Sequence, residues 1–214
     1  MPYRAWLLVC LLLAIALSAI APANRFDWAL EHTPTAILLA WIVWYERRAH
    51  GSPLSNTAYT LLLAFLLLHV VGAHFLYSNV PYREWAEHVF GSVPSWLATE
   101  RNHYDRVVHL CFGLFVLLPT AELTQRHVAK SNGWSVVVAI AFIGVFSKVY
   151  ELLEWGIAVA LSPEDAETYN GQQGDMFDAH KDMSLALLGS LLVAPWVRLR
   201  MSRTMAKETR AEPS

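Results

Sequence analysis

The sequence predicts an all-helical integral membrane protein, a transmembrane bundle of about six spans. Of its 214 residues, 55% are hydrophobic and only 16% are charged, whereas roughly a quarter of the residues are charged in an average soluble domain. The apolar residues also stand in long blocks. Long stretches of alternating hydrophobicity, which a transmembrane β-barrel needs, are missing. Most of the chain is therefore expected to lie in lipid.

Six blocks meet or approach the length of about 20 apolar residues with which a helix crosses a bilayer. They run roughly over Ala5–Ile20, Ala29–Tyr45, Thr57–Tyr77, Tyr104–Ala121, Trp134–Leu161 and Met183–Val197. The second block is the weakest because its beginning carries Glu31 and His32, and a re-entrant or buried segment stays open there. The first block also resembles a cleavable signal sequence, but its apolar run is long, which favours an uncleaved anchor.

The distribution of positive charge predicts the orientation of the bundle, because Lys and Arg resist translocation and collect on the cytoplasmic side. With six spans and the N-terminus inside, ten would be cytoplasmic, namely Arg4, Arg47, Arg48, Arg126, Lys130, Arg198, Arg200, Arg203, Lys207 and Arg210. Five would lie outside, namely Arg25, Arg83, Arg101, Arg106 and Lys181. This excess predicts that both termini are cytoplasmic.

Composition also limits the domain organisation and the function. We expect a single transmembrane domain over residues 1–200 and a disordered cytoplasmic tail over 201–214, since the tail is polar and without periodicity. The net charge of −2 and the absence of a basic patch argue against nucleic-acid binding. Cys10 and Cys111 lie in apolar blocks near opposite membrane faces, so no disulfide is expected.

The ionisable residues of the spans gather at one level of the membrane, at the extracytoplasmic end of the predicted bundle. Ten of them come from four stretches of the chain: His69, His74, His103, Asp105, His109, Glu151, Glu154, Asp175, Asp178 and Asp182. Ionisable groups in spans are costly and usually face a bundle interior, so this convergence is the strongest functional clue in the sequence. The two longest connections, Ser78–His103 and Ser162–Asp182, would lie on the same side.

Residue type and spacing favour a site for a divalent metal ion. Asp105 and His109 are four residues apart and Glu151 and Glu154 are three apart, so each pair shares one face of a helix. Imidazole and carboxylate suit zinc, iron or manganese, and zinc is the first expectation. The candidate ligands are His103, Asp105, His109, Asp175, Asp178 and Asp182. In the favoured arrangement His103, His109 and either Asp178 or Asp182 hold the ion, although no recognised zinc-protease or EF-hand pattern is present.

Other polar residues could support such a site. The candidate supporting or substrate-binding residues are His69, His74, Lys148, Tyr169, Asn170, Gln172 and Gln173. A structural interpretation stands beside this one, because buried His and Asp side chains often only bond to the backbone, and Lys148 is spaced to pair with Glu151. For any single residue the structural interpretation is favoured. For the whole cluster the functional one is favoured, because so many ionisable groups are expensive to keep at one level.

Three stretches resemble the YjdF family of bacterial inner-membrane proteins, namely RNHYDRVVH (101–109), KVYELLEW (148–155) and YNGQQGDMFDAHKDM (169–183). The resemblance extends over most of the chain and includes HFLYSNVP at 74–81. It implies a small multi-pass protein of the bacterial inner membrane and leaves the chemistry open. The chain departs from the family pattern at Phe177 and His180, where members more often carry Trp and Gln, so no mechanism is built on these two residues.

Three functions remain open. The first is a metal-dependent hydrolase or transferase that acts on a lipid or lipid-linked substrate at the outer leaflet, with Glu151 or Glu154 as the general base for metal-bound water. The second is a proton-relay or transport protein, in which Lys148, Glu151, Glu154 and His109 reach into the membrane. The third is a non-catalytic membrane partner whose outer loops dock another protein. The oligomeric state is left open.

Overall fold

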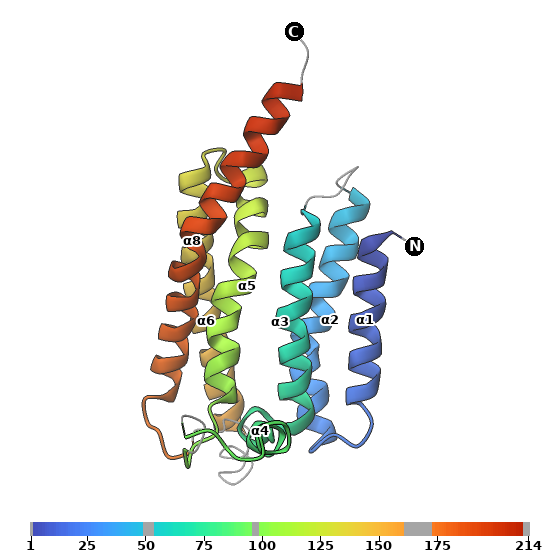
Figure 1. Cartoon of the computed structure of the whole chain (residues 1–214), viewed down its shortest axis with the longest axis vertical. Helices are drawn as coiled ribbons and strands as arrows, with labels where there is room; N and C mark the ends of the chain where they lie inside the picture. Colours follow the sequence, from blue (N-terminus) through green and yellow to red (C-terminus); the bar gives the residue numbers. More distant parts are fainter. Residues whose placement is uncertain (1, 49–53, 96–98, 161–172, 212–214) are drawn as a thin grey trace.

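In the part of the chain that the structure describes, six long helices run alternately in opposite directions, and a short helix closes one end of the bundle (Figure 1). The computed structural model describes residues 2–48, 54–95, 99–160 and 173–211, with side chains as far as residue 203. Its elements are α1 (Tyr3–Ser18), α2 (Arg25–Arg48), α3 (Asn56–Phe75), the 3-10 turn η1 (Tyr77–Asn79), α4 (Tyr82–Phe90), α5 (Tyr104–His127), α6 (Asn132–Ala160) and α8 (Asp178–Ala211). Within those residues the chain forms no strand, which confirms the predicted helical class.

The two ends of the bundle differ in what they carry. At the α4 end lie α4, η1 and residues 99–103 and 173–177, where α5 and α8 begin and α6 finishes (Figure 1). At the opposite end, called here the terminal end, α1 begins and α8 finishes (Figure 1). In the described residues an even number of long helices, α2, α3, α5 and α6, thus lies between α1 and α8 in the chain.

Four helices are long and apolar enough to cross a membrane, namely α3, α5, α6 and the part of α8 over Asp178–Arg203. The multi-pass character predicted from composition is thereby supported by individual helices. Helix α1 is apolar but has only 16 residues. Helix α2 has 24 residues, but Asp27, Glu31 and His32 near its beginning make it too polar to stand among the four. The predicted total of six spans therefore rests on α1 and α2.

The polar beginning of α2 is buried by neighbouring helices. Glu31 and His32 are 6% and 8% exposed. The Tyr150 hydroxyl of α6 donates to a Glu31 carboxylate oxygen at 3.0 Å, and His69 Nε2 of α3 lies 3.1 Å from the Glu31 carbonyl oxygen. Polar groups in a span are satisfied in this way when they face the interior of a bundle.

Two groups of three helices pack side by side, α1 with α2 and α3, and α5 with α6 and α8 (Figure 1). Helix α3 packs against α5 and joins the two groups. Fully buried Leu117 and Leu118 of α5, Ile143 of α6 and Ala186 of α8 form the centre of the larger apolar core. The α4 end of the second group holds most of the polar candidates.

Helices α5 and α8 touch backbone to backbone. A Cβ atom on Gly113 would lie 2.0 Å from the carbonyl oxygen of Ala186, and one on Gly189 would lie 2.2 Å from the carbonyl oxygen of Leu110. Facing glycines allow membrane helices to approach closely, because without a hydrophobic driving force in lipid the association depends on van der Waals contact. This pair fixes the distance between α5 and α8.

The predicted disordered tail differs from the structure, in which α8 continues to Ala211. Between Arg200 and that residue the sequence is MSRTMAKETRA, which contains neither Gly nor Pro. Met, Arg, Ala, Lys and Glu are all good helix formers, so a helix that leaves the bundle at Arg203 meets no signal to stop. The next proline is Pro213.

Substituting Gly113 with Ala should destabilise the protein by about 1–3 kcal/mol, since the added methyl group forces α5 and α8 apart. Gly144→Ala on α6 is the matched control, because nothing lies within 4 Å of its added Cβ. The control should leave stability unchanged or raise it slightly through helix propensity. Thermal unfolding of both variants in detergent, followed by tryptophan fluorescence, measures the difference; equal midpoints would contradict the close contact.

Candidate functional site

Helix ends place acidic side chains at the α4 end of the bundle. Asp105 lies in the first turn of α5 and Asp178 in the first turn of α8. The helix macrodipole is positive at these N-termini and favours negative groups there. Asp182 and His109 lie about one turn further along α8 and α5. Because α5 and α8 are held in contact, these side chains meet.

Three side chains form a compact group of metal-ligand type, Asp105 and His109 from α5 and Asp182 from α8. One ligand atom of each lies within 4.8 Å of the others. His109 Nε2 is 3.6 Å from Asp105 Oδ1 and 3.4 Å from Oε1 of Glu151, which α6 brings to the group. Asp182 is 2% exposed. Among the described residues, neither its Oδ1 nor Glu151 Oε1 has a hydrogen-bond partner.

These separations are those that ligands of one metal ion require. Zinc binds His nitrogen and carboxylate oxygen at about 2.0–2.2 Å, so the edge of a tetrahedron of such ligands is about 3.4 Å. The contacts of His109 with Asp105 and Glu151 are of that length. A buried carboxylate oxygen that accepts no hydrogen bond also needs a cation or a proton beside it, since isolated buried charge is very costly. The Asp105, His109 and Asp182 group has donor atoms of the types that divalent cations bind, all within 4.8 Å of one another, and the separations of His109 from Asp105 and Glu151 are close to the edge of such a tetrahedron.

Glu151 and Glu154 occupy one face of α6 at the same depth. The Glu151 side chain is 10% exposed, and its Oε1 lies 3.4 Å from His109 Nε2. Lys148 is exposed on α6, and none of the ion pairs seen in the described residues includes it. The expected pair of Lys148 with Glu151 is therefore not formed.

Basic side chains form ion pairs with the other two candidate aspartates, Asp175 and Asp178. Arg101 and Arg106 lie 2.5 and 3.3 Å from Asp178 Oδ1, and Arg106 and Lys181 lie 2.5 Å from Asp175 Oδ2. We call these five residues the cationic rim. The hydrogen bond from Lys181, with further help from the Phe177 N–H and Arg106, lowers the pKa of Asp175 to about 2. The structure thus places Asp175 and Asp178 in ion pairs beside the metal-ligand group.

His103 lies at the beginning of α5 among arginines. Its Nδ1 is 3.4 Å from Arg106. Loss of solvent, and then the positive charges of Arg106 and Arg101, lower the pKa of His103 below its ordinary value. The His103 imidazole is not part of the compact group that Asp105, His109 and Asp182 form. The structure therefore separates His103 from His109, which the sequence grouped together.

The two histidines of α3 bond to protein groups. His69 Nδ1 lies 2.5 Å from the Tyr77 hydroxyl, and its Nε2 faces the Glu31 carbonyl. His74 Nδ1 lies 2.8 Å from the carbonyl of Ser18 at the end of α1. Neither is among the three ligand-type side chains that the described residues bring together. These contacts fit the structural interpretation of both residues.

Hydrogen bonds anchor the segment before α8 on the segment before α5. Gln173 Oε1 accepts from the Asn102 N–H at 2.8 Å, and Gln173 Nε2 donates to the Asn102 carbonyl at 3.1 Å. Asn102 Nδ2 in turn donates to the carbonyl of Val80 at 2.9 Å. Gln173 therefore positions the entrance of the site. The other candidates of this loop, Tyr169, Asn170 and Gln172, lie outside the described residues.

Several residues of the site escaped sequence reasoning. Glu31 counted only as a weakness of its block, and Tyr150 was not singled out, although it precedes Glu151 in the KVYELLEW motif. Their hydrogen bond joins α2 to α6. His32, which counted like Glu31 as a weakness of its block, is buried edge-on against Trp28 and His69, with ring centroids 4.7 and 5.5 Å away. A helical wheel that turns Glu31 and His32 toward α3 was the sequence signal that could have indicated these contacts.

Comparisons with known proteins agree with the membrane character of the helices. A family model described as "Predicted membrane protein (DUF2238)" matches residues 3–203. Over 182 residues, 85% of the chain, the sequence is 31% identical to the "Inner membrane protein YjdF" of Escherichia coli (strain K12), of which the match covers 82%. No solved structure matches. The first two findings confirm the resemblance and the inner-membrane location predicted from the three motifs.

Asp175 should make the protein sensitive to acid. Because its pKa is lower in the folded state than its ordinary value of 3.8, the unfolded chain takes up the proton first as the pH falls. The stabilisation is full above about pH 4 and is lost between pH 4 and about pH 2. Asp175→Asn should flatten this part of the stability curve, measured by tryptophan fluorescence in detergent. A curve with the wild-type slope would contradict the ion pairs of the cationic rim.

Proposed function

Since the chain belongs to the DUF2238 family of membrane proteins, we propose that it is a six-span inner-membrane protein with a divalent metal centre at its extracytoplasmic end. Asp105, His109 and Asp182 are the ligands, and zinc is the first candidate metal, with iron and manganese next. The observation that carries the proposal is the fully buried Asp182, whose Oδ1 has no partner among the described residues and faces two further ligand-type side chains.

The proposed topology follows from geometry and charge together. The six long helices alternate in direction, so α1 begins and α8 finishes at one end (Figure 1). Among the residues of that terminal end whose side chains the structure describes, eight are Lys or Arg, namely Arg4, Arg47, Arg48, Arg126, Lys130, Arg198, Arg200 and Arg203, and two are acids, Glu46 and Glu122. The positive-inside rule then favours a cytoplasmic terminal end and an extracytoplasmic metal centre.

The chemistry that such a centre supports is hydrolysis or group transfer with a metal-bound water as nucleophile. Glu151 is the proposed general base, because its Oε1 lies 3.4 Å from His109 Nε2 and therefore next to the ion. Glu154, three residues further along α6, would take over the proton that Glu151 accepts from the water. The protein supplies the ligands, the base and a water-poor surrounding, and the ion polarises the water.

A lipid or lipid-linked molecule of the outer leaflet is the proposed substrate. The group lies near the beginnings of two membrane helices, at the level of lipid head groups. The cationic rim next to it contains three basic residues and two aspartates, a net charge of +1 (3 − 2). A head group with a negative charge is favoured beside such a rim.

Metal binding is the first property to measure. The protein, purified in detergent and stripped with a chelator, should bind about one zinc ion per chain, measured by isothermal titration calorimetry and elemental analysis. The double variant His109→Ala, Asp182→Ala should bind at least roughly a hundredfold more weakly, because two of three ligands are lost.

Asp175→Asn is the matched control for metal binding, since it removes an acid at the same end that lies outside the ligand group. It should keep the zinc affinity of the wild type. Equal loss in the control and in the double variant would show that general charge, and no ligand group, attracts the ion. Wild-type protein that binds no zinc, iron or manganese would overturn the proposed centre.

Glu151→Gln separates binding from chemistry. If Glu151 acts as the base, this variant keeps the metal and loses about 10²- to 10⁴-fold in turnover. The assay follows release of water-soluble products from phospholipids and polyprenyl phosphates in the presence and absence of zinc. Undiminished turnover in Glu151→Gln, or full activity in the stripped protein, would contradict the proposed roles.

A proton relay is the second candidate function, and a specific chain of contacts favours it. The Tyr150 hydroxyl donates to Glu31 and joins α6 to α2, and Oε1 of the neighbouring Glu151 lies 3.4 Å from His109 Nε2 of α5. Proton-linked flux in proteoliposomes from metal-free protein would favour the relay over the metal enzyme. A docking role without chemistry would show neither flux nor turnover.

A further inference from the structure

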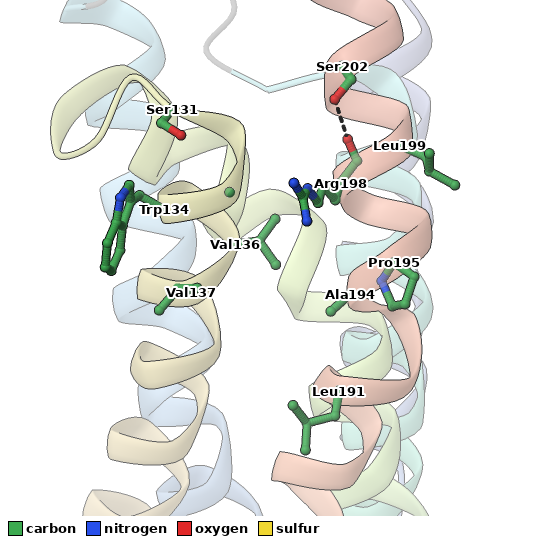
Figure 2. A pocket seen from close by; sticks show the side chains of 11 residues that line it. Ser131, Trp134, Val136, Val137, Leu191, Ala194, Pro195, Arg198, Leu199 and Ser202 are labelled. Atoms are coloured by element: carbon green, nitrogen blue, oxygen red, sulfur yellow. Dashed lines mark hydrogen bonds between the residues drawn. The ribbon is translucent and has the colours of Figure 1, made fainter.

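A groove at the terminal end lies far along the bundle from the metal-ligand group (Figure 1). Helices α6 and α8 form its walls, and its volume is about 890 Å³ (Figure 2). Val136, Val137, Leu191, Ala194 and Pro195 supply an apolar lining. Ligand sites in proteins have volumes of about 300–1,000 Å³, so the groove is large enough for part of a lipid.

A positive charge enters this apolar groove. The Arg198 side chain extends from α8 into the space between the two helices, toward α6 (Figure 2). Ser131 and Ser202 lie beside it at the open end of the groove. No acidic side chain of the described residues pairs with Arg198. An arginine in this place keeps its stem on apolar surface and its guanidinium at the membrane interface.

A second groove at the same end repeats this pattern. It lies between α1 and α2, has a volume of about 560 Å³ and is lined by Leu8, Leu12, Leu39, Ala40, Val43, Trp44, Arg47 and Arg48. Apolar helix walls again finish in arginine at the terminal end. Tryptophan borders both grooves, Trp134 in the first and Trp44 in the second, as is common where a protein meets lipid head groups.

We infer that the groove between α6 and α8 binds an anionic phospholipid, with an acyl chain on the apolar lining and the head-group phosphate at Arg198. The lining excludes a polar ligand, and the charge of the terminal end complements a negative head group. Basic pockets between transmembrane helices are known to recognise anionic lipids in this way. The inference does not depend on the metal centre, which lies at the α4 end.

The test is a lipid titration of the delipidated full-length protein by native mass spectrometry. The probes are phosphatidylglycerol and phosphatidylcholine with identical acyl chains. The wild type should bind phosphatidylglycerol about fivefold more tightly, since one interfacial Arg contributes roughly that factor for an anionic lipid. Arg198→Gln should clearly weaken this preference, and the second groove with Arg47 and Arg48 would account for any part that remains. Arg203→Gln, an exposed arginine of α8 outside the groove, should keep it.

Two further readouts locate the lipid and do not depend on the Arg198 variant. Phosphatidylglycerol with brominated acyl chains should quench tryptophan fluorescence, and Trp134→Phe should remove more of this quenching than Trp44→Phe. The preference of the wild type for phosphatidylglycerol should also fall with added salt. Equal affinity for both lipids, equal effects of Arg198→Gln and Arg203→Gln, or quenching that persists without Trp134 would overturn the inference.

Discussion

The backbone contact between α5 and α8 is the constraint on which the rest of the α4 end depends. Gly113 and Gly189 leave no room for a side chain between the two helices. Asp105 and His109 stand on α5, and Asp182 stands on α8, within about two turns of these glycines. The close approach of the two helices brings the Asp182 carboxylate to within 4.8 Å of the ligand atoms of Asp105 and His109. Lipid provides no hydrophobic force to close a gap between them, so the glycines have to allow this approach.

The carboxylates at the α4 end fall into two sets that differ in their partners. The cationic rim neutralises Asp175 and Asp178 with arginine and lysine, whereas Asp105 and Asp182 face His109 and the carboxyl group of Glu151. The first set has its counter-charges in the chain itself. Among the described residues the second set has no Arg or Lys within ion-pair distance, and in our proposal a bound cation supplies the missing positive charge.

The sequence predicted the helices well, because a span is decided by local hydrophobicity alone: the block at Trp134–Leu161 corresponds to α6, Asn132–Ala160. It could not select Asp182 over Asp178 as a ligand. That choice depends on Arg101 and Arg106, which meet Asp178 across more than seventy residues of sequence. The extension of α8 to Ala211 was missed for a different reason, since polarity was taken as a sign of disorder where helix propensity decides.

The buried beginning of α2 has a consequence for how the chain enters the membrane during synthesis. Glu31 receives its hydrogen bond from Tyr150, which is made 119 residues later. Until α6 leaves the ribosome, the carboxyl group of Glu31 has no such donor, and a lone helix with Asp27, Glu31 and His32 partitions poorly into lipid. In the proposed six-span topology, stable integration of α2 would therefore depend on the later arrival of α6.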